Sequence, residues 1–462
     1  MTRVSILLLL LLSPLSFLCP AFAQSQQILT PHCSGNAATD TAGLGTLMRS
    51  GGTSPAAITF APAKEEPLCK LDDLVLPPNV TLDLTHGGVY VESGKTLTIK
   101  GPLLASDTAT VFFNALPGQG TVLLAKATAA RPQWWGARGD DVADDTLPIQ
   151  AAVRAVPGGV VQLSAGTFLI TNTIGISADN TQLVGSGFYS SVIHCNPATE
   201  RPCIDIAQRS GMISFVGIRD LGLLSTNLVR KTGIRIADAT EVFLDNVKLN
   251  GIVSANKESV GLELRGRQLQ TFRNVTITAD RPISIEDDPN TIYDADQYHF
   301  ENLYLVANPA QPCISVASGV NLSNVTLDGY QSWIQCKHGF YFRDTNTTNI
   351  AFGVTIKNAR WEQNTDDDGY FIFLNHNTRL DGLILENLYG GGVHGRGLYL
   401  RKVSTATITN FQYQGRLEVL NLDATDRHFV FVNPAWGNGT LTLEGFTDYE
   451  SLPRGALSKT RP

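Results

Sequence analysis

Short apolar stretches recur along the chain at intervals that suit a coiled β structure. In the first recurring element, a turn residue precedes apolar, polar and apolar positions, as in Gly233-Ile-Arg-Ile and Gly261-Leu-Glu-Leu. Eight copies begin 21 to 31 residues apart, at Cys203, Gly233, Gly261, Pro282, Cys313, Gly339, Tyr370 and Gly397. Because alternate residues of a strand face opposite sides, each copy predicts a short strand with one outward position between two buried ones.

A second element runs in step with the first and consists of Asn or Asp followed by a short strand. The series comprises Asp220, Asn246, Asn274, Asn302, Asn324, Asn358, Asn387 and Asn410. Asn tolerates the left-handed backbone of a tight bend, and stacked Asn side chains can form a hydrogen-bonded ladder. Two or three short strands per repeat predict a solenoid whose coils stack into parallel sheets. Propeller blades would be more even, and leucine-rich repeats would be shorter and richer in Leu.

Composition agrees with an all-β protein. The chain contains 42 glycines, only 3 methionines and 17% charged residues, together with many runs of Val, Ile and Thr. These proportions are typical of strands separated by turns. One short helix is predicted near residues 145–156, where Asp144 or Asp145 can cap a stripe formed by Ile149, Val153 and Val156.

A longer motif precedes the repeats. It reads WWGARGDDVADDT over residues 134–146, IQAAV over 149–153 and GGVVQL over 158–163. This segment resembles the opening of the pectate-lyase superfamily β-helix proteins, including the rhamnogalacturonase/epimerase-like group. The resemblance is close over residues 132–195 and implies a single-stranded right-handed parallel β-helix of the pectin-lyase-like kind. Asp141 departs from the family, which usually has Gly in this turn, but Asp can adopt the same backbone.

The N-terminal residues have the features of a signal peptide. Arg3 supplies a positive start, an apolar run follows, and Ala21-Phe22-Ala23 matches a cleavage motif. The apolar run is too short for a permanent membrane anchor. We therefore expect a secreted protein, extracellular or periplasmic after cleavage near Ala23. The expected parts are a signal peptide (1–23), an N-terminal β-rich region of leading coils or a small β domain (24–130), the β-helix (131–450) and a C-terminal tail (451–462).

The net charge bears on the binding partner, and the number of cysteines bears on disulfide bonds. The formal net charge of −7 becomes −8 when Arg3 leaves with the signal, and the chain has no basic run, which argues against nucleic acid. A neutral or acidic sugar stays open, because local charge can oppose the net sign. Six cysteines remain in the exported chain, and an even count favours disulfides over free thiols. The simplest pairing joins sequence neighbours: Cys33 with Cys69, Cys195 with Cys203, and Cys313 with Cys336.

The repeat register places a row of outward side chains along one sheet. Its central positions are Asp205, Arg235, Glu263, Ser284, Ser315, Tyr341, Ile372 and Tyr399. Two residues further along the strands lie Ala207, Ala237, Arg265, Glu286, Ala317, Arg343, Leu374 and Arg401. A groove along this sheet is the convenient binding site of a β-helix. Arg can form paired hydrogen bonds with sugar carboxylates, and Tyr can stack on a sugar ring, so we expect a polysaccharide or oligosaccharide partner.

Glu263 and Glu286 are the candidate catalytic pair. They lie on adjacent coils two residues out of step, which puts their Cα atoms about 8 Å apart. This spacing is compatible with the carboxylate pair of a retaining or an inverting glycoside hydrolase. Asp287 and Asp288 follow and could supply a second acid. The candidate substrate-binding residues are Asp205, Arg235, Arg265, Tyr341, Arg343, Tyr399 and Arg401.

Three classes of function remain open. The preferred class is a glycoside hydrolase acting on an acidic or complex polysaccharide. The alternatives are a non-catalytic carbohydrate-binding or adhesin-like β-helix, whose Glu–Arg pairs merely keep the sheet soluble, and a polysaccharide lyase. A lyase would use Arg235, Arg265, Arg343 or Tyr341 to remove a proton beside a neutralised uronate. Asp366, Asp367 and Asp368 could bind Ca²⁺, but a twelve-residue calcium loop is lacking, so no cofactor is predicted.

Overall fold

The computed structural model describes residues 27–60, 68–125, 128–208, 211–287, 295–343, 350–362 and 369–422, together with short strands up to residue 450. At residues 350, 376–379 and 392–395, and from 414 onward, only the backbone is described. The expected signal peptide and C-terminal tail lie outside the described residues. So do Asp288 and the three aspartates 366–368.

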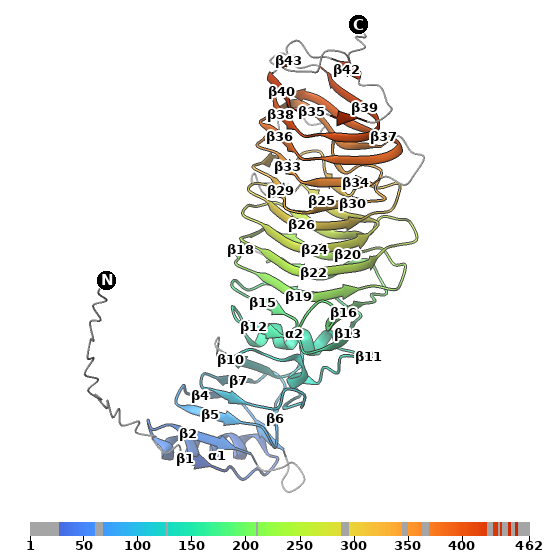
Figure 1. The fold of residues 1–462 in the computed structure, drawn as a ribbon. Helices are drawn as coiled ribbons and strands as arrows, with labels where there is room; N and C mark the ends of the chain where they lie inside the picture. Colours follow the sequence, from blue (N-terminus) through green and yellow to red (C-terminus); the bar gives the residue numbers. More distant parts are fainter. Residues whose placement is uncertain are drawn as a thin grey trace, which may run out of the picture.

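The chain folds into a parallel β-solenoid of about 12 turns with two short helices (Figure 1). Strands pair with the equivalent strand of the next coil, and each described pairing is parallel. The predicted right-handed parallel β-helix is therefore confirmed. Along the sheet that carries the predicted outward row, the strands are β14 (Ile174–Ile176), β17 (Arg201–Ile206), β20 (Lys231–Ala237), β23 (Val260–Arg265), β25 (Arg281–Glu286), β27 (Ile314–Val316), β31 (Phe340–Arg343), β35 (Tyr370–Asp381), β37 (Tyr389–Val403) and β39 (Gln412–Leu422).

The other faces of the solenoid are built from the strands between these. They include β12 (Val160–Gln162), β13 (Gly166–Ile170), β15 (Gln182–Val184), β16 (Ser191–Cys195), β19 (Gly217–Leu224), β22 (Phe243–Ile252), β24 (Thr271–Ala279), β26 (His299–Val306), β28 (Leu322–Ser323), β29 (Thr326–Asp328), β30 (Gln331–Ile334), β32 (Ile350–Phe352), β33 (Thr355–Lys357), β34 (Ala359–Glu362), β36 (Leu383–Glu386) and β38 (Thr405–Thr409). Small bridging strands β18 (Ile213–Ser214) and β21 (Ala239–Thr240) pair with each other. The last coils add β40 (His428–Val432), β41 (Ala435–Trp436), β42 (Thr442–Glu444) and β43 (Tyr449–Glu450).

The N-terminal region forms three short parallel sheets at one end of the solenoid (Figure 1). Their strands are β1 (Gln27–Leu29), β2 (Ala56–Thr59), β5 (Val80–Asp83) and β8 (Leu103–Leu104); β3 (Cys69–Leu71), β6 (Val89–Val91) and β9 (Phe112–Phe113); and β4 (Leu74–Leu76), β7 (Thr96–Ile99) and β10 (Thr121–Leu124). Helix α1 (Ala37–Gly51) packs against β3. Asn36 caps it by accepting a hydrogen bond from the Thr39 amide at 3.1 Å.

The motif before the repeats folds into a compact connection. It comprises a 3₁₀ turn, η1 (Pro132–Trp135), strand β11 (Asp140–Asp144) and helix α2 (Thr146–Ala155), close to the predicted helix. The N-cap residue of α2 is Asp145, whose side chain makes no capping hydrogen bond, while the preceding Asp144 carboxylate accepts from the Thr146 amide at 3.0 Å. Asp145 instead accepts from the amides of Arg138 and Gly139, and burial raises its pKa despite these two bonds. Asp141 has a φ of 59°, the left-handed backbone expected at this departure from the family pattern.

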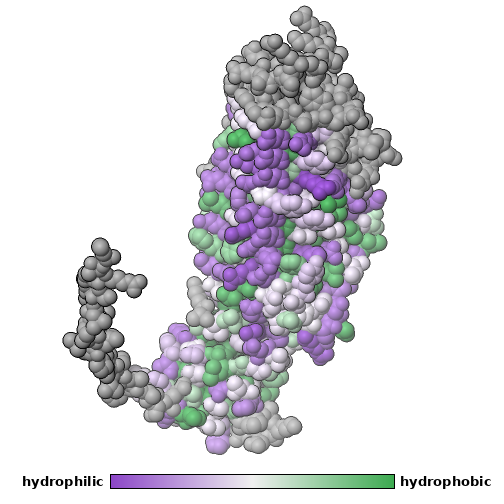
Figure 2. Space-filling view, in the orientation of Figure 1, coloured by the Kyte–Doolittle hydropathy of each residue, from purple (hydrophilic) through white to green (hydrophobic). Residues whose placement is uncertain are grey.

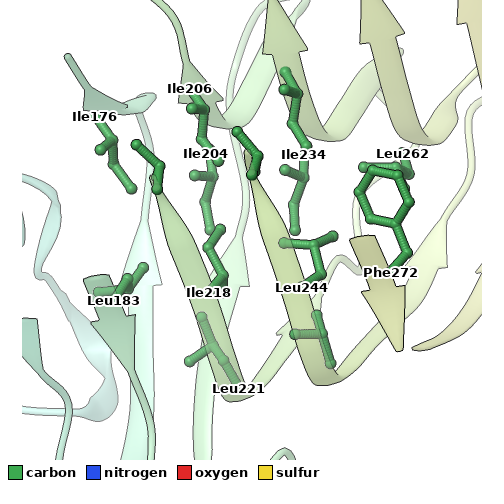
Figure 3. Packing of buried hydrophobic residues seen from close by; sticks show 14 of the residues in the cluster. Ile176, Leu183, Ile204, Ile206, Ile218, Leu221, Ile234, Leu244, Leu262 and Phe272 are labelled. Carbon is green, nitrogen blue, oxygen red and sulfur yellow. The ribbon is translucent and has the colours of Figure 1, made fainter. Parts of the chain in front are cut away.

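Apolar side chains from facing sheets fill the interior of the solenoid. Ile204, Ile234 and Leu262 come from three successive coils and lie in register. Opposite them, Leu244 and Phe272 continue the same layers from β22 and β24 (Figure 3). All five side chains are buried, which is the pattern that the apolar positions of the repeat predict. Outward positions are mostly polar, and hydrophilic side chains gather along the central coils in the view of Figure 2.

An Asn ladder runs along one bend of the solenoid, as predicted. Asn302 donates to Asn274 at 3.0 Å, Asn387 donates to Asn358 at 3.1 Å, and Asn410 donates to Asn387 at 2.9 Å. These residues have φ values between 53° and 57°, so the left-handed backbone and the ladder occur together.

The assignment of Asn324 to this ladder was wrong. Asn324 lies at a different bend, between β28 and β29. Asp328 takes its place in the ladder and accepts from the Asn358 side-chain amide at 3.0 Å. The prediction failed because a strand of alternating buried and outward residues follows each of the two bends. A string such as Asn324-Val-Thr-Leu therefore fits either bend.

All three predicted disulfides are present. Cys33 bonds to Cys69, Cys195 to Cys203, and Cys313 to Cys336, with Cα–Cα distances of 4.8, 5.9 and 5.3 Å. The first joins two segments of the N-terminal region, and the other two lie within the solenoid. Such bonds suit an oxidising environment.

Candidate active-site groove

The predicted outward row lies in register on one sheet. Direct strand partners join Asp205, Arg235, Glu263, Ser284, Ser315 and Tyr341 in coil order. Arg265 pairs with Glu286 in the neighbouring row. Glu263 and Glu286 are therefore on adjacent coils and two residues out of step, as the repeat predicted.

The register predicted for the next coil was wrong by one residue. Ile372 and Leu374 are fully buried, whereas Phe373 pairs with Tyr341 and Asn375 pairs with Arg343. Phe373 then pairs with Tyr399, so it takes the outward place that the prediction gave to Ile372. The segment from 370 to 374 is apolar throughout, and without alternation the sequence does not determine which face each residue occupies.

A pocket of about 400 Å³ opens on the charged part of the row, over β17, β20, β23 and β25. Its lining residues are Glu200, Arg201, Pro202, Arg230, Lys231, Thr232, Arg235, Glu258, Val260, Glu263, Arg265, Arg281 and Glu286. Six of these residues are cationic and four are acidic. The lining is therefore net positive, although the whole chain has a formal charge of −7.

The two candidate catalytic carboxylates have different surroundings within this pocket. Glu263 is 8% exposed and accepts from the Arg265 guanidinium at 2.5 Å and from the Thr232 hydroxyl at 3.0 Å. Glu286 accepts from the Ser284 hydroxyl, which itself lies 3.1 Å from the Ser315 hydroxyl. Among the described residues, Glu263 therefore has a cationic partner and Glu286 has one hydroxyl partner. Such unequal environments are what a pair with two chemical roles requires.

Asp205 and Arg235 neutralise each other beside the pocket. The guanidinium donates from Nε and Nη2 to the two carboxylate oxygens at 2.8 and 2.7 Å. The hydrogen bond with Asp205 raises the pKa of Arg235 above its ordinary value. This paired geometry makes the two residues a rigid edge of the pocket rather than two free binding groups.

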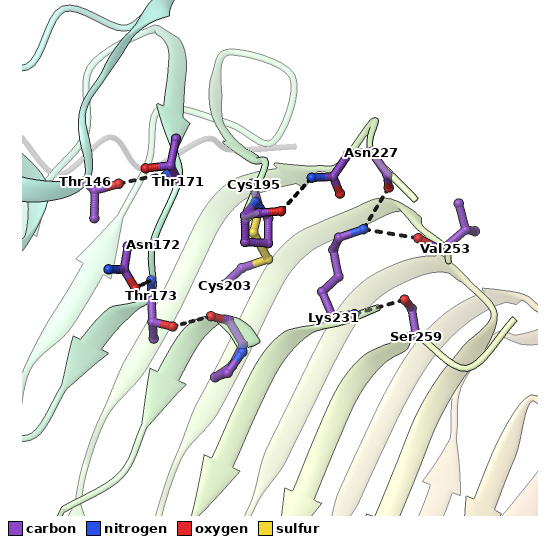
Figure 4. The surroundings of a disulfide bond; sticks show 12 residues. Thr146, Thr171, Asn172, Thr173, Cys195, Cys203, Asn227, Lys231, Val253 and Ser259 are labelled. Atoms are coloured by element: carbon purple, nitrogen blue, oxygen red, sulfur yellow. Dashed lines mark hydrogen bonds between the residues drawn. A yellow bond between two sulfur atoms is a disulfide. The ribbon is translucent and has the colours of Figure 1, made fainter. Parts of the chain in front are cut away.

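Lys231 is a pocket residue that sequence reasoning missed. Its side chain is only 1% exposed, and Figure 4 shows its ammonium between the carbonyls of Asn227 and Val253, at 2.8 and 3.1 Å. Burial lowers the pKa of Lys231 to about 8, while the negative charge of Asp280 partly opposes this shift. A lysine just before the repeat's turn glycine was the available signal. Its partners are the carbonyl of Asn227, four residues earlier in the loop before β20, and the carbonyl of Val253 on the next coil.

Arg281 is the second missed residue. It begins β25, pairs with Val260 and lines the pocket. Among the described residues its side chain has no ion-pair or hydrogen-bond partner, and its Nε atom is buried. A guanidinium without an acidic partner at a pocket wall can bind an anionic group of a ligand.

Several predicted site residues lie outside this pocket. The Asp287 carboxylate lies against Gly319 on the following coil and does not line the pocket. Tyr341, Arg343 and Tyr399 are two to four coils beyond Glu286. Arg401 also lies there and donates to Asn375 at 3.3 Å. The groove therefore divides into a charged pocket and a separate aromatic part.

The described residues form no group of three or more side chains suited to hold a metal ion. Within the same part of the chain, none of the helices is long and apolar enough to cross a membrane.

Stacked parallel coils with a polar groove on one sheet define the pectin-lyase-like class of right-handed β-helix proteins. The sequence model of the family described as rhamnogalacturonase A/epimerase, pectate lyase-like, matches residues 134–365, which is half of the chain. The protein belongs to this family.

Several solved structures are similar to the chain at low sequence identity. The A-module of the mannuronan C-5 epimerase AlgE6 of Azotobacter vinelandii is 13% identical, covers 70% of this chain and 99% of its own, and has a TM-score of 0.45. The family 28 exopolygalacturonase of Yersinia enterocolitica is 11% identical, with coverages of 71% and 77% and a TM-score of 0.42. PfbA, a surface adhesin of Streptococcus pneumoniae, is 14% identical, with coverages of 66% and 91% and a TM-score of 0.33. A search of curated proteins finds no match to the chain.

Proposed function

We propose that the protein is a secreted glycoside hydrolase that cleaves an acidic polysaccharide in the charged pocket. The observation that supports this proposal most is the placement of Glu263 and Glu286 in one pocket whose lining is net positive. Two carboxylates supply the acid and the base or nucleophile of glycoside hydrolysis. The excess of cationic side chains favours a negatively charged sugar. The three disulfides suit an extracellular or periplasmic location.

The surroundings of the two carboxylates suggest how the roles divide. Arg265 and Thr232 both donate to Glu263, so its carboxylate is held as a hydrogen-bond acceptor, as a base or nucleophile requires. Glu286 has no cationic partner among the described residues, so it is the better candidate to protonate the leaving oxygen. Arg281 would bind the acidic group of the sugar. In this scheme the Glu286 proton goes to the glycosidic oxygen as that oxygen leaves the anomeric carbon, and Glu263, or a water that Glu263 deprotonates, forms the new bond to that carbon.

A polysaccharide lyase is the second candidate, and Lys231 and Arg281 favour it. β-Elimination from a uronate needs its carboxylate neutralised and the adjacent proton removed. Arg281 could neutralise the carboxylate. A lysine with a pKa of about 8 is partly neutral near physiological pH and could accept the proton once it leaves its carbonyl partners.

The deciding experiment is a polysaccharide panel scored for new reducing ends and for ultraviolet absorbance of unsaturated ends. Hydrolysis predicts reducing ends without absorbance, and Glu263→Gln and Glu286→Gln should each lower the rate by about 10²- to 10⁴-fold. Glu301→Gln is the matched control, since Glu301 is partly exposed on β26 away from the pocket. Absorbance that disappears in Lys231→Met would establish the lyase instead. Binding without product from any polymer would establish the non-catalytic alternative.

A further inference from the structure

Beyond the charged pocket, the groove continues into a row of stacked aromatic side chains. Tyr341, Phe373 and Tyr399 lie on β31, β35 and β37 and are direct strand partners. Their ring centroids are 5.0 and 4.5 Å apart, with interplanar angles of 17° and 14°. We call these three residues the aromatic row. The sequence pattern predicted Tyr341 and Tyr399 as outward substrate-binding residues but missed Phe373 between them, because it assigned Phe373 to the buried face.

A second set of side chains holds the aromatic row in place. The His338 ring stacks on Tyr341 at 4.8 Å, and its Nδ1 atom accepts from the Tyr370 amide at 3.1 Å. Tyr370 in turn meets the Tyr399 ring edge-on at 5.5 Å and accepts a hydrogen bond from Arg396 at 3.0 Å. Burial lowers the pKa of His338 to about 4, so this ring stays neutral at physiological pH. Rings fixed in this way lose little conformational freedom when they bind a ligand.

The outward end of the aromatic row combines apolar and polar groups. Because stacked rings cover each other's faces along the solenoid axis, a ligand in the groove meets their outer edges. The hydroxyls of Tyr341 and Tyr399 have no hydrogen-bond partner among the described residues and are not buried. Phe373 places a hydrocarbon edge between these hydroxyls, which are two coils or about 10 Å apart. Aromatic edges are electropositive and attract oxygen atoms.

We propose that the aromatic row is a second saccharide-binding site that holds a distal part of the same chain whose reactive part occupies the charged pocket. Both sites lie in one row of strand partners, so an elongated ligand can follow the sheet from one to the other. In the central row the small side chains of Ser284 and Ser315 lie between them. Tyr341 is about 10 Å and Tyr399 about 19 Å beyond Glu286 along the axis.

A sugar chain is the occupant that this surface fits best. Free hydroxyls alternate with an aromatic edge, and both kinds of group bind the oxygen atoms that a saccharide presents along its length. Asn375 and Arg401 add hydrogen-bonding groups on the neighbouring row. The inference rests on the proposed function in one respect, namely that one saccharide chain occupies both the pocket and the aromatic row. Its test measures binding rather than cleavage.

The test compares dissociation constants for saccharides of different lengths. Polygalacturonate, alginate, xylan and a mixed-linkage β-glucan are screened by affinity electrophoresis, and the polymer bound most tightly is fractionated into defined oligomers for calorimetry. Phe373→Ala should weaken binding of an octasaccharide about 5- to 10-fold and leave disaccharide binding unchanged. Tyr341→Phe combined with Tyr399→Phe removes only the two hydroxyls and should weaken octasaccharide binding about 3- to 10-fold. Tyr304→Ala removes a partly exposed tyrosine from another sheet and is the matched control.

Three outcomes would overturn the proposal: the wild-type protein binds none of the four polymers, both groove variants bind the octasaccharide like the wild type, or they weaken disaccharide and octasaccharide binding equally. If Phe373→Ala does not fold, the double Tyr→Phe variant decides, because it keeps every ring of the stack. Cleavage that depends on Glu263 while binding ignores the aromatic row would reject the row and keep the hydrolase. Length-dependent binding through the aromatic row without any product would keep the row and reject the hydrolase.

Discussion

Replacing Lys231 with Met should remove a specific part of the protein's dependence of stability on pH. The Lys231 ammonium is buried, and its pKa falls from 10.5 to about 8 in the folded chain. Between these values the unfolded chain binds a proton that the folded chain does not, so stability increases as pH rises through this window. Below pH 8 both states are protonated, and the folded state bears the full cost of burying the charge. At ~1.4 kcal/mol per pKa unit, the gain on raising the pH is at most about 3 kcal/mol.

The assay is urea unfolding of the wild type and of Lys231→Met at pH 7 and pH 9.5. Other groups also titrate over this range, so the informative quantity is the difference between the two proteins at each pH. We expect the wild type to gain about 1 to 3 kcal/mol relative to Lys231→Met as the pH rises. The absolute stability of the variant at pH 7 reflects two opposing effects, because it loses a buried charge and leaves the Asn227 and Val253 carbonyls without a donor. A pH-independent difference between the two proteins would refute the reasoning.

Further predictions concern the ladder, the register and the core. Asn387→Ala should destabilise the fold by about 2 kcal/mol, because it breaks hydrogen bonds to two neighbouring coils and places Ala at a φ of 54°; urea unfolding measures this, and a change below 0.5 kcal/mol would contradict the ladder's role. Ile372→Ala should lower the free energy of unfolding by about 2 to 4 kcal/mol, because the Ile372 side chain is fully buried. Phe373→Ala should lower it clearly less, whereas the repeat alone predicts the opposite order. Phe272→Ala should cost about 3 to 5 kcal/mol, since its ring is fully buried and stacks on Phe300 at 4.9 Å; a loss under 1 kcal/mol would show that the core collapses around the gap.

The coil and most of its register could be predicted from the sequence alone. Strands alternate with a period of two, so a turn residue followed by an apolar–polar–apolar triplet determines the outward residue locally. For this reason Asp205, Arg235, Glu263 and Tyr341 were placed correctly without any knowledge of which strands pair. Two further predictions rest on equally local properties. The backbone preference of Asn predicts its place at the left-handed bends, and nearness in sequence predicts the three cysteine pairs.

Only the tertiary structure decided which of these residues share a site. The pocket depends on groups that meet across coils: Lys231 donates to the Val253 carbonyl of the next coil as well as to the Asn227 carbonyl just before β20, and Arg281 pairs with Val260 of the preceding coil. Side-chain direction also had to be seen, since Asp287 follows Glu286 in sequence but lies against Gly319 instead. Local pattern fails where it contains no alternation, as it does around Phe373. There the stacking of neighbouring coils, rather than the segment itself, selects the face that each residue occupies.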